Sequence, residues 1–402
     1  MKRILFVEDN AILLQMYAMM LDRERDGWDV ATAEDGQKAL EIMAQAPFDV
    51  VVSDMRMPGM GGVELLGEVR RQYPHACRII VSGIGDHEEV ARSLGSTHQF
   101  LAKPFSVKTL KATLARIHGL DAYVKDEKLK ALVGQLGQLP SFPSLYLEIM
   151  KELDASDTAI EDIAKIVAKD PGMTAKMLQV ANSAAMGLAQ KIHDPFAAVQ
   201  LLGMNTVRSL ALSAHVFSSY EQSNLKGFSI TELWEHSMKT GLFARMIMRL
   251  ERAEAADAED ACTAGMLHDI GKLMLVGSRP KEFQRALTLA AERKMPAQEA
   301  ELEVFGTTHA GVAAYLLGLW ALPAPIVEAV AFHHTPGRAE LREFTPLTAV
   351  HAANFLGREP GRADISESSS GLDLGYLAAI GMQNRLESWR DGAMKLTKGE
   401  ND

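Results

Sequence analysis

Acidic and polar residues stand at the ends of short apolar runs in the first part of the chain. Glu8 and Asp9 follow the run "RILFV", Asp54 ends "FDVVVSD", and Ser82 and Lys103 stand at the ends of two later runs. If these runs are parallel strands of one sheet, their carboxyl ends meet at one edge. Carboxylates gathered there repel one another unless a cation lies among them, and oxygen ligands with room for water favour Mg²⁺. The residue types therefore predict a magnesium site.

The same residues can transfer a phosphoryl group. A carboxylate nucleophile beside a hard cation can attack phosphorus, and a lysine can balance the charge that develops on oxygen. We therefore expect phosphoryl transfer to Asp54, which forms an acyl phosphate. The alternative interpretation is that the acidic residues only cap loops and that Lys103-Pro104 is a turn.

Histidines and one aspartate form a second group after residue 230: His236, His268, Asp269, His309, His333, His334 and His351. Imidazole and carboxylate side chains from separate helices can converge on a transition metal. The adjacent His268 and Asp269 can both reach one ion if a helix presents their backbone edge to it. A histidine on an apolar helix, however, is more often a hydrogen-bonded core residue. His333 and His334 point about 100° apart on a helix, so we expect one of them to face elsewhere.

The first group requires elements that bring strand ends together. Up to about residue 118, amphipathic stretches alternate with short β-branched runs, which are "RILFV", "WDVATA", "FDVVVSD", "CRIIVSG" and "QFLAKP". Such alternation is typical of a parallel sheet with helices on both faces. We therefore predict an α/β doubly wound domain with a five-stranded parallel sheet, in which ligands lie beyond the carboxyl ends of the strands.

Short motifs stand at these strand ends in a fixed order: "VEDN", "DMRMPGMGG", "VSG" and "KPF". With this spacing, residues 1–118 resemble a response-regulator receiver domain, which has a flavodoxin-like fold. The resemblance implies these roles: Asp54 accepts the phosphoryl group; Glu8, Asp9, Asp54 and the backbone carbonyl of Arg56 surround Mg²⁺; Ser82 and Lys103 contact the phosphoryl group; Phe100 is the switch aromatic. For Phe100, a place in the apolar core is the alternative.

From Leu139 onward the β-branched runs end, and apolar residues recur at helical spacing in segments such as "SLYLEIMKELD" and "AAVQLLGMNTVRSLAL". We predict an all-α domain over residues 139–395 and a disordered tail over 396–402. Residues 119–138 predict an amphipathic linker helix, whose apolar stripe is Leu129, Leu132, Val133 and Leu136. This helix packs against a neighbouring domain or serves as a short signalling or dimerisation helix.

Longer segments of the helical half are more specific: "IAKIVAKDPGMTAKMLQVANSAAM", "LWEHSMKTG", "AGMLHDIGKL" and "HAGVAAYLLGLWALPAPIVEAVAFHH". They resemble the HDOD family, a helical output domain related to HD-type metal phosphohydrolases, over residues 139–357. The resemblance implies a role in bacterial signal output, frequently without catalysis. Asn182 and Ser183 belong to a motif of this family. We expect them to cap a helix or to hydrogen-bond between helical lobes rather than to bind a ligand.

The hydrolytic relatives carry a helix histidine, the HD pair and a distal aspartate. His236, His268 and Asp269 match the first three positions, but the fourth aligns with Asn354, whose neutral amide is a weaker ligand. Lys272 matches a lysine of the relatives that cleave cyclic dinucleotides, yet their Gly-Tyr-Pro signature is missing here. We therefore expect weakened binding of Mn²⁺ or Fe²⁺ and a weak or silent phosphodiesterase. If another ligand replaces the aspartate, the candidates are His309, His333 and His334.

Composition narrows the classes of protein further. The 402 residues are 47% hydrophobic and carry a formal net charge of −10, and no basic recognition helix is evident, so DNA binding is disfavoured. Cys77 and Cys262 lie far apart, which is typical of buried thiols in a reducing compartment. The N-terminal apolar run ends at Glu8, and prolines interrupt the longest apolar stretch. We therefore expect neither a secretion signal nor a membrane span, and predict a cytoplasmic protein.

The sequence thus predicts a two-component response regulator. A sensor histidine kinase or phosphotransfer protein would phosphorylate Asp54, and this would control a mostly non-catalytic HDOD output domain. That domain would act on a downstream protein or a cyclic-dinucleotide ligand, and homodimerisation is left open. The alternative is a phosphorylation-controlled metal phosphohydrolase that acts on a nucleotide or a cyclic dinucleotide. Asn354 is the residue that discriminates between the two functions.

Overall fold

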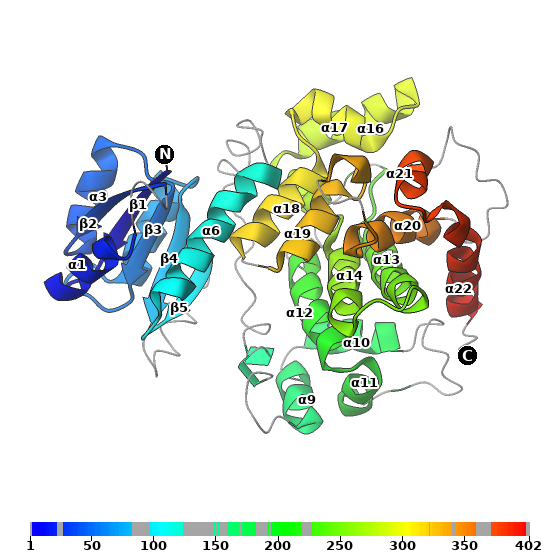
Figure 1. Cartoon of the computed structure of the whole chain (residues 1–402), viewed down its shortest axis with the longest axis horizontal. Helices are drawn as coiled ribbons and strands as arrows, with labels where there is room; N and C mark the ends of the chain where they lie inside the picture. The colour runs from blue at the N-terminus through cyan, green and yellow to red at the C-terminus, as the bar shows by residue number, and fades with distance from the viewer. Residues whose placement is uncertain are drawn as a thin grey trace. The chain divides into compact units, whose positions relative to one another are not determined.

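The computed structural model in Figure 1 divides into two compact units. The first comprises Met1–Ser144 with Leu316–Ala321, and the second comprises Leu145–Tyr315 with Leu322–Asp402. The structure describes residues 2–21, 27–82, 96–123, 148–149, 151–152, 159–168, 171–181, 192, 194–218, 225, 227–320, 322–339, 343–358 and 371–398.

Five parallel strands form the sheet of the first unit, in the order β2-β1-β3-β4-β5. Their bounds are β1 (Lys2–Val7), β2 (Trp28–Ala33), β3 (Val50–Asp54), β4 (Cys77–Ser82) and β5 (Gln99–Ala102). The predicted five-stranded parallel sheet is therefore confirmed. The chain adds β2 on one side of β1 and then adds β3, β4 and β5 on the other side. The strand order therefore reverses between β1 and β3. Ligands of doubly wound sheets bind at this point, beyond the carboxyl ends of the strands.

Helices cover both faces of this sheet: α1 (Ala11–Met19), α3 (Gly36–Gln45), α4 (Gly62–Gln72) and α6 (Val107–Tyr123). On one face, Leu5 and Val51 belong to an apolar core with Met43 of α3 and Leu65 of α4. Tyr17 of α1 packs against Phe6 of β1, with ring centroids 5.6 Å apart. This two-sided burial explains why the strands read as nearly continuous apolar runs.

Helix α6 extends past residue 118, where the sequence placed the end of the first domain. Leu110, Leu114 and Ile117 are buried at helical spacing, and the glycine at position 119 is tolerated within the helix. Residues 119–123 therefore belong to α6. The rest of the predicted linker helix lies outside the described residues, as do Asn182 and Ser183.

In the described residues of the second unit, every regular element is a helix, apart from a single bridge between Leu225 and Phe228. This confirms the predicted all-α half. Its elements are α9 (Ile160–Ala168), α10 (Pro171–Ala181), α11 (Pro195–Leu202), α12 (Met204–Ser218), α13 (Ile230–Leu250), α14 (Ala255–Leu267), α15 (Ile270–Ser278), α16 (Pro280–Arg293), α17 (Ala297–Phe305), α18 (His309–Leu319), α19 (Ala324–Phe332), η2 (Pro336–Arg338), α20 (Pro346–Arg358), α21 (Leu374–Ala379), η3 (Gln383–Arg385) and α22 (Leu386–Lys398).

Helix α13 is central to the second unit and packs against α14 and α20 (Figure 1). It begins where the Ser229 side chain accepts a hydrogen bond of 3.2 Å from the backbone N–H of Glu232. A serine cap and an acidic residue in the first turn both stabilise a helix N-terminus. Phe243 and Ile247 are buried on its inner face. His236 of the second group lies on α13, His309 begins α18 and His351 lies on α20, whereas the other four residues lie between helices.

Helix α22 ends the described part of the chain. The indole of Trp389 and the guanidinium of Arg385 each donate a hydrogen bond of 2.7 Å to Glu251, which follows α13. The buried Ala393 extends the same apolar face, so the helix continues to Lys398. Residues 396–398 are thus helical, which corrects the predicted tail. None of the helices described here is long and apolar enough to cross a membrane.

Candidate functional site

Three carboxylates gather at the carboxyl end of the sheet in the first unit. Glu8 and Asp9 follow β1, Asp54 is the last residue of β3, and these two strands pair directly. Each residue places a carboxylate oxygen within 4.8 Å of the others. Glu8 is buried, Asp54 is half-buried and Asp9 is exposed. The sheet therefore assembles one oxygen-rich cluster, here named the acid site, at its topological switch point.

Lys103 joins this cluster from the end of β5. Its Nζ lies 2.7 Å from Glu8 Oε2 and 2.8 Å from Asp54 Oδ1. Burial alone would lower the pKa of Lys103, but hydrogen bonds with Asp54 and Glu8 hold it above its ordinary value. Burial raises the pKa of Glu8, and the charge on Asp54 adds to the rise against the effect of Lys103. The lysine therefore remains a full positive charge between two carboxylates.

Two other residues predicted for the acid site, Ser82 and Arg56, follow or end strands of the same sheet. Ser82 is the last residue of β4 and pairs with Ala102 of β5, directly before Lys103. Arg56 lies in the loop between β3 and α4. Phe100 is within β5, but its side chain lies outside the described residues. Behind the site, a Cβ on Gly62 would overlap the backbone oxygen of Asp54. Only glycine therefore lets α4 begin this close to the end of β3.

The His268-Asp269 pair lies in a break between two helices, because α14 ends at Leu267 and α15 begins at Ile270. The sequence interpretation placed the pair on a helix edge. The break instead turns both side chains toward each other, with Nε2 of His268 3.3 Å from Oδ2 of Asp269. Both residues are at most 1% exposed. The pair is therefore at the centre of the second unit's core.

The expectation that His333 or His334 faces elsewhere is wrong. Helix α19 ends at Phe332, and both histidines lie in the turn that follows, with ring centroids 4.0 Å apart. Outside a continuous helix, adjacent side chains need not diverge by the helical angle. Nε2 of His334 lies 3.2 Å from Nε2 of His309, which begins α18. All three histidines therefore contribute to the same cluster.

Hydrogen bonds at Nδ1 determine which nitrogen of each ring is free. Nδ1 of His268 donates to the carbonyl of Gly265 at 2.7 Å, and Nδ1 of His333 donates to the carbonyl of Val330 at 2.8 Å. A carbonyl oxygen can only accept, so these nitrogens carry the proton. In the neutral rings, the lone pair is then at Nε2. Nε2 of His268 and of His333 are both buried and have no hydrogen-bond partner.

Glu301 controls the ring of His309 in a similar way. Its Oε2 accepts hydrogen bonds from Nδ1 of His309 at 2.6 Å and from the backbone N–H of the same residue at 2.8 Å. Glu301 is 2% exposed. Carboxylates that hold the far nitrogen of a metal-binding histidine fix its orientation and raise its basicity. Sequence reasoning did not identify Glu301, because nothing marks a glutamate eight positions before a histidine as its partner.

The free nitrogens converge on the carboxylate of Asp269. Two groups of ligand atoms, each within 4.8 Å of one another, share this residue: Asp269, His309, His333 and His334 form one, and His236, His268 and Asp269 form the other. Oδ1 of Asp269 is buried, and Nε2 of His309 lies 3.0 Å from it. Lone pairs that face one another repel unless a cation lies among them. The donors of this HD cluster therefore fit a divalent transition-metal ion.

Charges within the HD cluster shift the pKa values of its members. Burial alone would raise the pKa of Asp269, but His268 and Lys272 hold it well below its usual range. Burial would lower the pKa of His309, but the charge of Glu301 raises it. Burial lowers the pKa of His333 and His334 well below the ordinary value, and neighbouring imidazoles add to this. The cluster thus keeps its carboxylate ionised and most of its rings neutral.

Lys272 and Asn354, which the sequence singled out, both lie at the cluster. Nζ of Lys272 is 2.6 Å from Oδ2 of Asp269. Oδ1 of Asn354, on α20, is 2.9 Å from Nε2 of His236, on α13. Burial lowers the pKa of His236 to about 4, so its ring is neutral and Nε2 can donate to the amide oxygen. The structure therefore gathers every predicted residue of the degenerate HD site.

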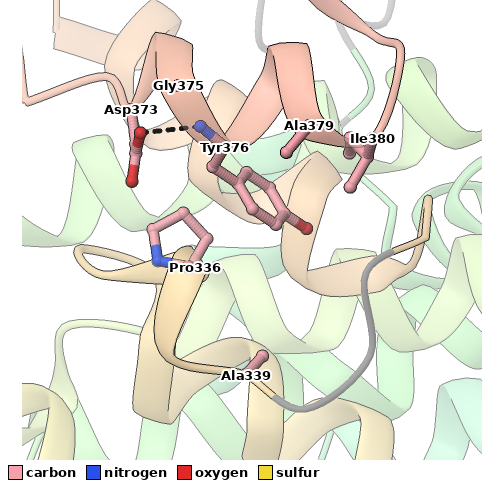
Figure 2. Close-up of a pocket in the computed structure, with 8 residues that line it drawn as sticks. Pro336, Ala339, Asp373, Gly375, Tyr376, Ala379 and Ile380 are labelled. Atoms are coloured by element: carbon pink, nitrogen blue, oxygen red, sulfur yellow. Dashed lines mark hydrogen bonds between the residues drawn. The ribbon is translucent and has the colours of Figure 1, made fainter.

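His351 does not join the HD cluster but supports the turn that carries His333. Its Nδ1 donates to the backbone carbonyl of His333 at 2.7 Å, and its Nε2 accepts from the backbone N–H of Asp373 at 2.8 Å. Asp373 also lines a pocket of about 200 Å³. Figure 2 shows Pro336 and Tyr376 among the residues that line it. The His333 turn is thus tied to the wall of this pocket.

Comparison with known proteins relates each half of the chain to a family. A family model of the response regulator receiver domain matches residues 4–115, and a model of the HDOD domain matches residues 139–336. A response regulator receiver protein from Anaeromyxobacter sp. is 42% identical over 110 residues, which cover 27% of this chain and 44% of that protein. An uncharacterized protein from Treponema pallidum is 25% identical over 237 residues, which cover 58% and 45%. The chain spans less than half the length of these two curated relatives.

A solved structure supports the fold of the helical half. The crystal structure of an HDOD domain protein from Geobacter sulfurreducens matches with a TM-score of 0.52 and 23% identity, over 67% of this chain and 97% of that one. At this identity the likeness establishes the fold alone. The sheet topology, the acid site and both family models agree with one domain organisation. The chain has an N-terminal receiver domain and a C-terminal HDOD domain, and it belongs to the response regulators of two-component signalling.

Proposed function

We propose that Asp54 accepts a phosphoryl group and that its phosphorylation controls the HDOD domain. The observation that carries this proposal is the position of Lys103, whose Nζ lies within 2.8 Å of both Asp54 and Glu8. A carboxylate oxygen of Asp54 attacks phosphorus, and the bond from phosphorus to the donor breaks. Lys103 and Ser82 then contact the oxygens of the transferred group, where the ammonium balances their charge.

The acid site also fits Mg²⁺, which receiver domains generally bind. Its oxygens come from Glu8, Asp9 and Asp54, and the backbone carbonyl of Arg56 would complete the set. A bound Mg²⁺ supplies positive charge that neutralises phosphoryl oxygens. Phosphorylation adds about 1.5 to 2 negative charges at neutral pH, so Lys103 must redistribute its contacts. We propose that this change passes through Phe100 and the segment 119–138 to the HDOD domain.

Receiver domains generally interact with histidine kinases, and we propose a sensor histidine kinase or phosphotransfer protein in the cytoplasm as the donor. The HDOD domain would act on a downstream protein or a cyclic dinucleotide. The domains proposed for this pathway are a receiver that ends with α6 at Tyr123, a linker up to residue 138 and an output domain from residue 139 to the end of α22 at Lys398.

Labelling with acetyl phosphate and Mg²⁺ tests the phosphoacceptor. Intact-mass spectrometry of the native chain should detect one added phosphoryl group, and Asp54→Asn should abolish it. Asp29→Asn is the matched control, because Asp29 lies in the same domain, on β2, and its carboxylate pairs with Arg3 near the surface. It should label like the native chain. Equal labelling of Asp54→Asn would refute the proposal.

We also propose that the HD cluster binds a divalent transition-metal ion. The specific observation is a pair of buried ring nitrogens without hydrogen-bond partners, Nε2 of His268 and Nε2 of His333, which both face the carboxylate of Asp269. Buried polar atoms are normally paired, and a cation satisfies acceptors that no donor reaches. Elemental analysis of the native chain should find Mn, Fe or Zn, and His333→Ala should lose it. The control is His75→Ala, at an exposed histidine of the receiver domain.

Hydrolysis of a nucleotide or cyclic dinucleotide at this cluster is the alternative function. A bound ion would supply the Lewis acid that activates water, but a catalytic ion needs an open position for water and substrate. His268, Asp269, His309 and His333 are at most 1% exposed, and Asn354 replaces a carboxylate. We therefore propose that the output acts by interaction. Turnover of a cyclic dinucleotide at about 1 s⁻¹ or faster, lost in His268→Ala, would favour hydrolysis instead.

A further inference from the structure

The carboxylate of Asp269 divides the HD cluster into two halves. Oδ1 faces His309, whose Nε2 lies 3.0 Å away, and His333, whose Nε2 lies 3.8 Å away. Oδ2 faces His268, whose Nε2 lies 3.3 Å away, and the ammonium of Lys272, which lies 2.6 Å away. One carboxylate therefore serves two sites of different composition, named here the three-histidine half and the lysine half.

The three-histidine half offers four ligand atoms from three separate segments of the chain. His309 begins α18, His333 and His334 follow α19, and Asp269 precedes α15. Glu301 and the carbonyl of Val330 hold the Nδ1 atoms of His309 and His333, so the two Nε2 atoms point inward. Nε2 of His309 is also 3.2 Å from Nε2 of His334. Three imidazoles and one carboxylate oxygen form a complete ligand set for a divalent transition metal.

The lysine half has one imidazole fewer than the other half and contains an ammonium group. It offers His236 and His268 and shares Asp269 with the other half. Nε2 of His236 is already hydrogen-bonded to Oδ1 of Asn354, and this amide contributes no negative charge. The shared oxygen Oδ2 already has a positive partner in Lys272. A divalent ion entering here meets one shared carboxylate and an ammonium that repels it.

From this asymmetry, and resting on the metal binding proposed above, we infer that the HD cluster holds a single divalent transition-metal ion, in the three-histidine half. Lys272 takes the place of a second ion on the other side of the Asp269 carboxylate. The degenerate site is thus reduced to one ion rather than emptied. Two residues exclude the second ion: Lys272 by its charge, and Asn354 by the carboxylate that it lacks.

Metal counting on the full chain tests this inference. The protein is saturated with Mn²⁺, passed over a desalting column and analysed for bound manganese, and its Mn²⁺ electron paramagnetic resonance spectrum is recorded. The native chain should hold one ion with the spectrum of an isolated Mn²⁺. Asn354→Asp and Lys272→Met should each raise the count to two and give the spectrum of a coupled pair. His334→Ala should lower the count to none, whereas His236→Ala should leave it at one.

Each outcome is decisive. Two ions in the native chain overturn the single-ion inference but leave the proposed metal binding intact. No ion in the native chain overturns both. If the count fell from one to none in His236→Ala but stayed at one in His334→Ala, the ion would lie in the lysine half, and the inference would be wrong. Because the Asn354 and Lys272 variants change different residues, one that misfolds leaves the other to report, and a count that stays at one in the folded variants refutes the role given to these residues.

Discussion

The two candidate sites are built around the same pair of residue types, an aspartate in contact with a lysine. Lys103 lies 2.8 Å from Asp54 in the receiver domain, and Lys272 lies 2.6 Å from Asp269 in the HDOD domain. The neighbours differ, because carboxylates surround the first pair and imidazoles surround the second. Oxygen ligands favour Mg²⁺ and nitrogen ligands favour transition metals. The surroundings of the pair, rather than the pair itself, determine the chemistry.

Exposure separates the two sites as clearly as ligand type. Asp54 has a side chain 13% exposed and shares its rim with the exposed Asp9, whereas the side chain of Asp269 is 1% exposed. A phosphoryl donor can reach the first carboxylate from solvent. The second is enclosed by the ends of several helices, which suits an ion that stays in place. This difference in exposure supports the proposals that the acid site reacts with a phosphoryl donor and that the HD cluster holds an ion without turnover.

The largest expected effect concerns a thiol in each domain. Burial raises the pKa of Cys77 in the receiver to about 12 and that of Cys262 in the HDOD domain to about 11. An ordinary thiol has a pKa near 8.5, so at pH 8 the thiolate of Cys77 is roughly a thousandfold scarcer and that of Cys262 roughly a hundredfold scarcer. Iodoacetamide should label neither in the native chain, and both should react in guanidinium. The slow labelling rate of the two native thiols should continue to rise above pH 9, because their pKa values are higher. The labelling rate of a free thiol levels off in that range.

These two thiols make each domain separately measurable. Labelling under increasing urea should report the unfolding of the receiver through Cys77 and of the HDOD domain through Cys262, read by peptide mapping. Rapid labelling of either cysteine without denaturant would show that its domain opens readily. Both residues are free and buried, as the sequence predicted.

The next effect concerns the glycines that let backbones meet at each site. A Cβ on Gly62 would overlap the backbone oxygen of Asp54, and a Cβ on Gly271 would overlap that of His309. Alanine at either position should destabilise its own domain by about 3 kcal/mol, the upper range for overpacking. Gly62→Ala should also impair phosphorylation, and Gly271→Ala should impair metal binding.

Gly67 provides the control for this pair, because nothing lies within 4 Å of a Cβ there. Since alanine favours helices over glycine by about 1 kcal/mol, Gly67→Ala in α4 should be neutral or stabilising. Urea unfolding, followed through the two thiols, gives the free energies. If Gly271→Ala left metal binding unchanged, the close contact between α15 and α18 would not position the cluster.

A smaller effect should appear when metal is added or removed. A ligand present at a hundredfold excess over its Kd stabilises the native state by about 2.7 kcal/mol. Mn²⁺ should therefore stabilise the HDOD domain by this amount, and a chelator should reverse it. In His333→Ala the effect should vanish. The selectivity contrast between the two sites would be lost if Mg²⁺ stabilised the HDOD domain as strongly as Mn²⁺ does.

The smallest effect is expected from Glu301, which contacts a ligand rather than the ion. Glu301→Gln keeps the shape but weakens the hydrogen bond to Nδ1 of His309, so metal affinity should fall about tenfold. Glu303→Gln is the control on the same helix, because Glu303 only pairs with Arg293 near the surface. Calorimetric titration with Mn²⁺ measures both variants. Equal affinities would mean that Glu301 has no positioning role.

The acid site could be predicted from the sequence because each of its residues is adjacent to a strand. Parallel pairing brings strand ends together without further information, so Glu8, Asp54 and Lys103 could be placed at one edge from their positions in the chain. The number of strands followed from the five β-branched runs that alternate with amphipathic stretches. The positions of these residues in the chain did not predict that Lys103 contacts both Glu8 and Asp54.

The HD cluster was predicted less completely, because helix ends are poorly marked in its sequence. His333 and His334 follow a run that looks helical, and the end of α19 at Phe332 is what lets both face the cluster. Glu301 and His351 act through hydrogen bonds across the core, and neither has a local sequence signal. Residue types identified this cluster, but only the packing of separate helices showed how its members meet.

The hydrogen bonds at the Nδ1 atoms have a consequence for how fast and how firmly the cluster captures an ion. The rings of His268, His309 and His333 are each held by a partner in the fold itself, so their rotational freedom is already lost when the domain folds. Capture then requires little further loss of side-chain entropy. We expect the cluster to behave as a rigid chelator, in which folding orders the ligand side chains before the ion binds.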